Sequence, residues 1–160
     1  MQKLIPIALL FALASCATPK MVSYSHKRLT SEGCEVGYSA LKKGGELFIV
    51  AQLTSDRLVF ADSPLLKIRT FKGEVLELSG VALASRTQHS AVLTGNIVVP
   101  YSTQRAMAQF KISNSQAAAL ADGIQKIQLT TVPIVHEKKF RRDKIGKKLH
   151  EMLTSASDEF

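Results

Sequence analysis

Two of the four histidines in this chain are followed directly by glutamate, as in the zinc-binding helix pattern His-Glu-x-x-His. That pattern needs a second histidine four residues after the first, because both imidazoles must lie on one helix face to bind one ion. Phe140 occupies this position after His136, and Thr154 occupies it after His150. We therefore expect no metal site, and no other motif indicates a cofactor.

Short motifs for nucleophilic catalysis or nucleotide binding give no positive indication either. The chain contains no G-x-S-x-G turn, no phosphate-binding loop and no G-x-G-x-x-G stretch. A Ser-His-Asp triad is defined by geometry rather than by spacing, so residues distant in the sequence can still form one. We expect a non-catalytic protein and retain, as an alternative, a hydrolase whose site is assembled by folding.

A cluster of basic residues is the strongest charge feature of the sequence. Residues 137–148 carry seven basic side chains against two acidic ones, a net charge of +5 in a chain of net charge +8. This local excess predicts contact with an anionic surface, such as lipid headgroups, a phosphorylated glycolipid or an acidic protein. The alternative is the solvated face of an amphipathic helix. The seven basic residues are Lys138, Lys139, Arg141, Arg142, Lys144, Lys147 and Lys148.

Cys34 lies in a segment that alternates like a half-buried strand. It shares its periodicity with Val36, Tyr38 and Ala40. This pattern predicts a buried thiol, and the neighbouring Glu35 disfavours a thiolate. A reactive or intermolecular thiol is the alternative.

The first residues have the composition of a secretory leader. A lysine lies near the start, and residues 4–13 form an apolar segment too short for a bilayer, which needs about 20 residues. The leader ends at Leu13, Ala14, Ser15 and Cys16, and polar residues follow at once. This combination resembles the lipobox of bacterial lipoproteins.

The resemblance implies a set of modifications at Cys16. Its thiol receives a diacylglyceryl group, the leader is cut before Cys16, and the new amino terminus is acylated. Two acyl chains anchor a protein stably, whereas one of myristoyl length binds a bilayer with only about 10⁴ M⁻¹. The residue after the cysteine is Ala17 rather than an aspartate, which in Gram-negative lipoproteins implies transfer to the outer membrane. We expect the domain on the periplasmic face of that membrane. An ordinary secretory leader is the alternative.

These features predict a lipid-anchored protein of the bacterial cell envelope that serves as a non-catalytic binding or interaction module. Its expected partners are the bilayer, through acylated Cys16, and an anionic envelope component or a protein. We expect no nucleic acid, because the leader directs the chain out of the cytoplasm. The alternative function is a module that binds an anionic glycolipid, polymer or membrane surface through residues 138–148.

Composition divides the chain into four parts. Residues 1–15 are the leader, 16–33 a lipidated cysteine with a polar tether, 34–154 a single domain and 155–160 a frayed tail. Val22, Tyr24 and His26 alternate, so part of the tether has the pattern of an edge strand. Only Cys34 is left in the domain, so we expect no internal disulfide.

Hydrophobic alternation predicts a mainly β (α+β) fold, an antiparallel sheet or β-sandwich with two late helices. Residues 86–90 resemble a loop, and Gly80 marks a bulge. The first helix is expected near 115–122, after a capping box of Ser113 and Gln116, and an amphipathic helix near 143–154, capped by Asp143. Strands are expected over residues 34–41, 46–54, 65–71, 75–84, 91–101, 105–112 and 124–135.

Overall fold

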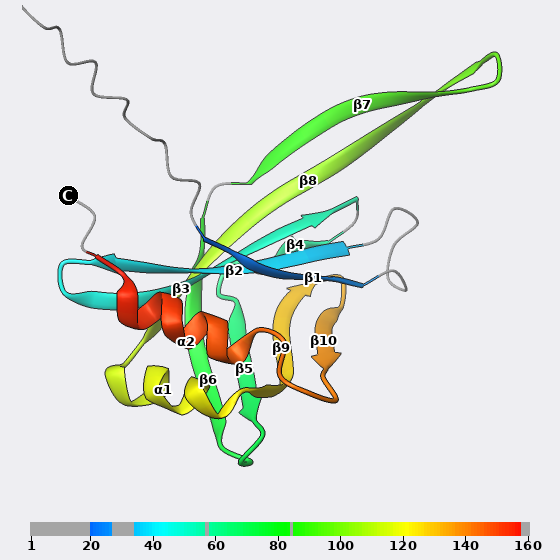
Figure 1. Ribbon diagram of the computed structural model, residues 1–160. Helices are drawn as coiled ribbons and strands as arrows, with labels where there is room; N and C mark the ends of the chain where they lie inside the picture. The colour runs from blue at the N-terminus through cyan, green and yellow to red at the C-terminus, as the bar shows by residue number, and fades with distance from the viewer. Residues whose placement is uncertain (1–19, 27–33, 57, 84, 158–160) are drawn as a thin grey trace, which may run out of the picture.

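The computed structural model describes residues 20–26, 34–56, 58–83 and 85–157 (Figure 1). The leader and the lipobox with Cys16 lie outside the described residues. Within these residues, most of the domain consists of strands, as the alternation predicts. The strands are β1 (Val22–His26), β2 (Cys34–Lys43), β3 (Glu46–Ser55), β4 (Val59–Phe60), β5 (Leu65–Thr70), β6 (Val75–Ala82), β7 (Arg86–Thr94), β8 (Ile97–Ile112), β9 (Ile124–Val132) and β10 (Val135–Lys139).

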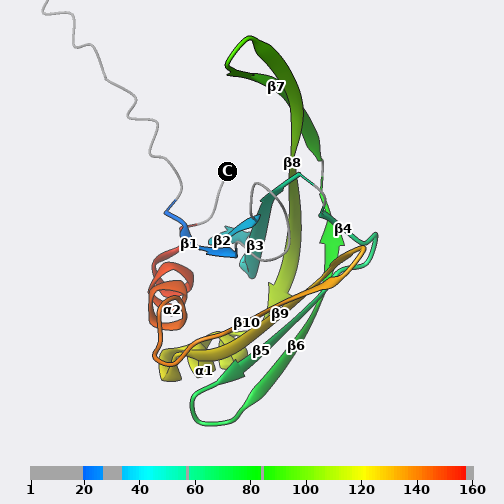
Figure 2. The same cartoon turned by 90° about the vertical axis from the view of Figure 1, so that its right-hand side faces the viewer.

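Two short helices complete the domain, α1 (Asn114–Ala119) and α2 (Gly146–Ser155), and a 3₁₀ turn extends α1 to Asp122. The predicted capping box begins α1. Ser113 Oγ accepts a hydrogen bond from the Gln116 backbone N–H at 3.2 Å, and Gln116 Oε1 accepts one from the Ser113 N–H at 3.0 Å. Figure 2 shows α1 and α2 together at one side of the curled sheet.

The strands form one continuous antiparallel sheet rather than separate layers. Neighbours follow the order β1-β2-β3-β8-β6-β5-β9-β10, with β4 paired to β9 and β7 paired to β8. The sheet curls strongly (Figures 1 and 2), and side-chain rings connect the two ends of this order. The Tyr24 ring of β1 stacks on the His136 ring of β10, with centroids 5.7 Å apart, and contacts Phe140 edge-on at 5.6 Å. The mainly β fold is therefore confirmed.

The core fills the inside of this curl. Alternate residues of the strands point inward, as Ile49, Ala51 and Leu53 of β3 do, and all three are fully buried. The apolar stripe of α2 packs on this core through Leu149 and Leu153, which are buried as well. The stripe that the helical spacing predicts is therefore covered by the domain itself.

Gly80 marks the point at which β6 changes its partner. Up to Ser79 the strand pairs with β5, and from Gly80 to Ala82 it pairs with β8. A Cβ atom at Gly80 would lie 2.5 Å from the buried ring of Phe110 and 2.8 Å from the carbonyl oxygen of Gln109. The bulge predicted at Gly80 is not found, because neither pairing of β6 shows a register shift. Gly80 instead lies where β6 begins to pair with β8 and where the two strands approach closely.

The segment from Arg86 to Ile112 differs from the prediction. Instead of a loop and two strands, it forms one long hairpin, because the chain reverses at Gly95 and Asn96. Gly95 has a φ of 62°, which suits the first central position of a two-residue hairpin turn. The strand expected over 91–101 is therefore wrong: its two halves pair with each other.

Two edge strands also differ from the expected boundaries. β1 lies within the stretch expected as a tether, and its Val22 is buried against β2. The edge-strand alternation of that stretch is confirmed. β10 was not expected as a strand, because its sequence, VHEKK, is mostly polar. It pairs with β9 after a turn that contains Pro133, so the strand expected over residues 124–135 ends at Val132 instead.

Candidate functional site

The β7–β8 hairpin projects from the rest of the molecule as a two-stranded ribbon (Figures 1 and 2). Arg86 and Arg105 face each other at its base, and Thr94 and Ile97 flank the turn at its end. From Arg86 to Thr94 the ribbon extends about 27 Å at ~3.4 Å per residue. Among the described residues, β7 pairs only with β8, and residues 97–103 of β8 pair only with β7. The ribbon therefore has two open edges.

The distal part of the ribbon, residues 91–100, carries apolar side chains on both faces up to the turn, where Thr94 and Asn96 are polar, and is called the apolar tip below. Its large side chains are highly exposed: Leu93 70%, Ile97 68%, Val98 63%, Val92 50% and Val99 46%. Successive strand residues point to opposite faces, so the Val92–Val99 pair covers one face and the Leu93–Val98 pair the other. Fully burying one such side chain contributes about 1.5–3 kcal/mol, so the apolar tip favours an apolar surrounding.

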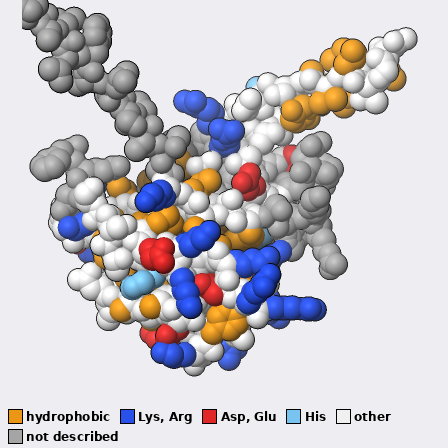
Figure 3. Space-filling view, viewed as in Figure 1, with side chains coloured by type: hydrophobic (Ala, Val, Ile, Leu, Met, Phe, Trp, Pro, Cys, Tyr) orange, Lys and Arg blue, Asp and Glu red, His pale blue; other side chains and the backbone are white. Residues whose placement is uncertain are grey.

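The ribbon carries no charge between its base and its end. Residues 87–104 contain no Asp, Glu, Lys or Arg. The half nearer the body is polar, and His89 Nδ1 lies 2.9 Å from Ser102 Oγ across the two strands. Figure 3 shows apolar side chains along the projecting hairpin and basic side chains near its base. Polarity thus falls along the ribbon, from the arginines at the base to the apolar side chains of residues 91–93 and 97–100, and the turn itself carries the uncharged polar residues Thr94 and Asn96.

The basic residues between 138 and 148, called the basic segment below, lie on β10, on the connection that follows it and on α2. Its side chains are exposed except for Lys138, which is half-buried. Lys144 lies within the helix expected near 143–154, but α2 begins at Gly146, so Lys144 precedes the helix. The segment comprises Lys138 and Lys139 on β10, Arg141, Arg142 and Lys144 in the connection, and Lys147 and Lys148 on α2.

Acidic side chains neutralise only part of this segment. Glu137 lies 2.8 Å from Lys126 Nζ and 3.6 Å from Lys139 Nζ. The hydrogen bond from Lys126, more than any other contact, lowers the pKa of Glu137. In the part of the chain that the structure describes, the other basic side chains of the segment form no ion pair. Figure 3 shows basic side chains spread over the face of α2 and β10, with acidic ones between them.

Phe140 and Asp143 fix the basic segment to the domain. Phe140 is buried, and its N–H donates to the carbonyl of Gln125 at 2.8 Å. Asp143 accepts from the backbone N–H groups of Gly146 at 2.8 Å, Lys147 at 2.9 Å and Ile124 at 3.0 Å. Partial burial alone would raise the pKa of Asp143, but these hydrogen bonds lower it overall. The N-cap residue of α2 is Ile145 rather than the predicted Asp143, but the carboxylate of Asp143 still binds the first turn of α2 and ties it to the start of β9.

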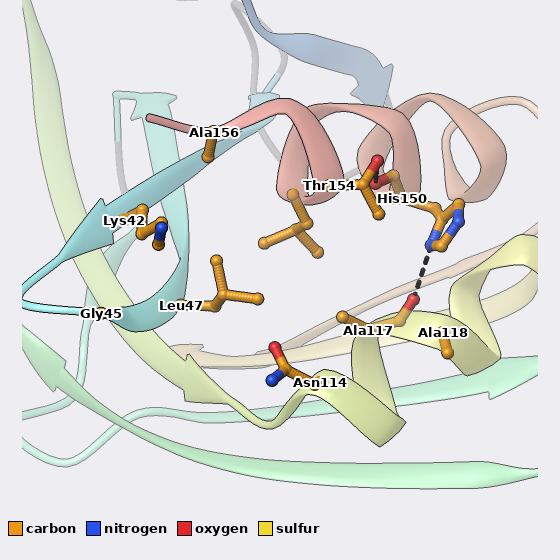
Figure 4. A pocket seen from close by; sticks show the side chains of 10 residues that line it. Lys42, Gly45, Leu47, Asn114, Ala117, Ala118, His150, Thr154 and Ala156 are labelled. Atoms are coloured by element: carbon orange, nitrogen blue, oxygen red, sulfur yellow. Dashed lines mark hydrogen bonds between the residues drawn. The ribbon is translucent and has the colours of Figure 1, made fainter. Parts of the chain in front are cut away.

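A pocket of about 480 Å³ lies between α1, α2 and the β2–β3 turn (Figure 4). His150 lines it and donates from Nδ1 to the carbonyl of Ala117 at 2.9 Å. Thr154 lines it as well, but its hydroxyl points to the carbonyls of His150 and Glu151, both at 3.0 Å. Among the described residues, no hydrogen bond joins His150 to a hydroxyl or carboxylate, the pair that a hydrolase site needs.

One short motif for catalysis was missed in the sequence. Ser39 and Lys42 have the S-x-x-K spacing of some serine hydrolases. Residues three apart share a face on a helix, but on a strand they point to opposite faces of the sheet. Both residues belong to β2, so this strand places their side chains on opposite sides.

His136, the other histidine that is followed by a glutamate, belongs to the core. His136 is fully buried and stacks on Tyr24, whose hydroxyl lies 3.3 Å from that of Tyr38. Burial raises the pKa of both tyrosines, so both phenols stay neutral. Among the described residues, no three His, Cys, Asp or Glu side chains gather as metal ligands. This cluster joins the two ends of the curled sheet.

Cys34 is a buried thiol at the start of β2, as its alternation predicts. Burial, with smaller contributions from Asp56 and Glu35, raises its pKa to about 11. The thiol therefore stays protonated at neutral pH, which makes it a poor nucleophile.

Within the described part of the chain, no helix has the length and apolar composition that a membrane crossing requires. Comparison of the chain with protein-family models, curated proteins and solved structures finds no match. The candidate sites therefore rest on the geometry of the chain itself.

Sequence reasoning missed the projecting hairpin, which is the most exposed apolar feature. The two residues Gly95 and Asn96, between the apolar runs VLT and IVV, are a recognised hairpin-turn pair. That pair was the available indication of a reversal. Its consequence, two apolar arms side by side and away from the core, appears only in the folded chain.

Proposed function

We propose that this protein is a lipid-anchored, non-catalytic interaction module of the bacterial cell envelope, and that its contact element is the β7–β8 hairpin. The observation that carries this proposal is the apolar tip, whose large side chains are 46–70% exposed on both faces of an uncharged ribbon. Contiguous exposed apolar surface of this kind marks sites of protein or membrane contact.

The anchor in this proposal is acylated Cys16, on the basis of its resemblance to a lipobox. Ala17 supports sorting to the outer membrane, with the domain in the periplasm. The arrangement in the pocket supports a non-catalytic role, because the hydroxyl of Thr154 is directed to helix carbonyls rather than to His150.

Labelled palmitate, supplied to a Gram-negative host that makes the full chain, tests the anchor. We expect label on the wild type and on Cys34→Ser, the matched control for loss of a cysteine. Cys16→Ser should carry none and should leave the membrane fraction, because it lacks the thiol that accepts the lipid. Equal labelling of Cys16→Ser would refute the anchor.

Cysteine protection tests the hairpin as the contact element. In a Cys34→Ser background, Leu93→Cys is compared with Val75→Cys, which lies on β6 and whose wild-type side chain is 57% exposed. In envelope preparations, a water-soluble maleimide should label position 93 at least fivefold more slowly than position 75. Detergent should equalise the two rates. Equal rates before detergent would show that nothing covers the apolar tip.

A second candidate function is binding of an anionic envelope component through the basic segment. The observation that favours it is the exposed set of basic side chains, most of which have no acidic partner among the described residues. This surface lies on β10 and α2, away from the apolar tip, so both contacts can exist in one molecule (Figure 1).

A further inference from the structure

We propose that the apolar tip of the β7–β8 hairpin inserts into the surface of the bilayer as a second membrane contact. This inference rests on the proposed function for the position of the domain, and it names the partner of the hairpin. We infer that the apolar tip contacts lipid rather than a groove on another protein, for three reasons given below.

The first reason is that both faces of the apolar tip are apolar. Val92 and Val99 cover one face and Leu93 and Val98 the other, so one-sided docking would leave two of these side chains in water. A groove on a protein typically covers one face of a ribbon, and the other face is then polar. Lipid surrounds an inserted ribbon on all sides and therefore matches this pattern.

The second reason is that, apart from the uncharged turn residues Thr94 and Asn96, polarity changes along the ribbon in the order found across a membrane surface. The pairs from Thr94–Ile97 to Ala91–Pro100 span about 10 Å, which matches the 5–10 Å depth of interfacial insertion. Tyr101 follows in the next pair, and tyrosine is enriched at the level of the headgroups. Only uncharged polar residues follow, and the arginines at the base remain on the aqueous side.

The open edges limit the depth of this insertion. Unpaired backbone N–H and C=O groups are not tolerated in the hydrocarbon centre, where no water can satisfy them. Both edges of the apolar tip are open among the described residues. The tip therefore lies at the boundary between headgroups and acyl chains and does not cross the bilayer.

The third reason is the position of the anchor. β1 begins at Val22, six residues after Cys16, and six residues span at most about 20 Å. The first described residues lie at the end of the body from which the hairpin projects (Figures 1 and 2). The hairpin extends about 27 Å at ~3.4 Å per residue. A lipid on Cys16 would thus hold this end nearer to the bilayer than the hairpin is long, so the apolar tip reaches it.

Vesicle flotation of the chain from residue 16, with Cys16→Ser, tests the inference without the lipid anchor. One set of vesicles contains phosphatidylcholine only, and the other contains phosphatidylethanolamine and phosphatidylglycerol. We expect partition into both sets, because an apolar contact needs no anionic lipid. Leu93→Ser with Val98→Ser should lower the partition coefficient at least tenfold. The matched control, Val75→Ser with Val81→Ser, alters two exposed valines of β6 and should leave it unchanged.

Fluorescence adds a readout of depth, because the chain contains no tryptophan. In Leu93→Trp, vesicles should shift the emission to the blue, and lipids brominated near the headgroup should quench it. In Val75→Trp, vesicles should change neither property.

Three outcomes would overturn the inference. The first is absence of partition together with unchanged emission from Leu93→Trp, and the second is binding confined to phosphatidylglycerol vesicles. The third is a concentration-dependent dimer that the two serine substitutions in the apolar tip abolish, since the occupant would then be a second copy of this chain. None of these outcomes bears on palmitate labelling of Cys16.

Discussion

Asp143 joins two elements through one carboxylate. It accepts hydrogen bonds from the first turn of α2 and from Ile124 at the start of β9. The carboxylate therefore holds the basic segment in place between these elements. At the same scale, Phe140 anchors the segment through its buried ring, while its charged neighbours remain in solvent. Asp143 and Phe140 thus hold the basic segment on the domain, while its basic side chains remain exposed.

Asp143→Asn tests the role of this carboxylate. The amide keeps one acceptor oxygen but cannot accept from the Lys147 N–H, so we expect a loss of about 1 kcal/mol in the free energy of unfolding at pH 7. The pKa of Asp143 is lowered by folding from about 3.9, the value for an unfolded chain. Its contribution is therefore complete above pH ~4 and is lost as the pH falls through the folded-state pKa.

Urea unfolding at pH 7 and at pH 3 measures this difference. The difference in the free energy of unfolding between wild type and Asp143→Asn should be smaller at pH 3. Asp62→Asn is the control, because it removes the same charge from an exposed side chain. An equal loss in both variants, or a gap that widens in acid, would contradict the assignment.

At the scale of elements, β6 and β8 owe their arrangement to close backbone contact. β8 pairs with β3 and β6 in its second half and with β7 in its first half. β8 is long enough that its second half lies in the curled sheet and its first half forms the projecting hairpin. At Gly80, β6 begins to pair with β8, so β6 joins β5 to β8 and continues the curl of the sheet.

Gly80→Ala should destabilise the domain by about 1–3 kcal/mol, the usual cost of overpacking a core. The new methyl group would meet Phe110, which is fully buried and cannot move aside. Gly37→Ala is the matched control: its methyl group would meet the flexible side chain of Met21, which is 45% exposed and can rotate away. Thermal unfolding followed by circular dichroism compares the two. Equal effects would show that position 80 tolerates a side chain.

At the scale of the whole molecule, charge and apolar surface are separated. The hairpin, uncharged over residues 87–104, projects from one end of the body, whereas the basic segment spreads over β10 and α2 (Figure 3). A membrane contact through the hairpin would leave the basic segment exposed to solvent. The molecule can therefore present two surfaces with different chemistry, one to lipid and one to an anionic component.

Sedimentation with purified envelope fractions distinguishes these surfaces. Binding through the basic segment should fall at least about tenfold between low and moderate salt, because screening weakens exposed charges. The chain with Arg141, Arg142, Lys144, Lys147 and Lys148 changed to Ala should lose this salt-sensitive part. Leu93→Ser with Val98→Ser keeps all charges and should retain it. Salt-insensitive binding of the alanine variant and the wild type alike would identify the basic segment as a solvated face.

The sequence alone determined the local structure of this chain, because local structure depends on periodicity and on short-range hydrogen bonds. Alternation identified β2, β3, β5 and β6, and the change to helical spacing identified α1 and α2 with their caps. The burial of Cys34 followed from the same alternation. These features need only neighbours within a few residues, so one sequence suffices to predict them.

Only the tertiary structure decided how these elements meet and which residues remain exposed. An apolar run has the same sequence whether it lies in the core or outside it, so the exposure of Leu93 and Val98 could not be predicted. The contact of Tyr24 with His136 joins residues more than 100 positions apart, and no local pattern encodes it. Pairing across such distances depends on the whole sheet, because each strand's partner is set by the curl that the other strands create.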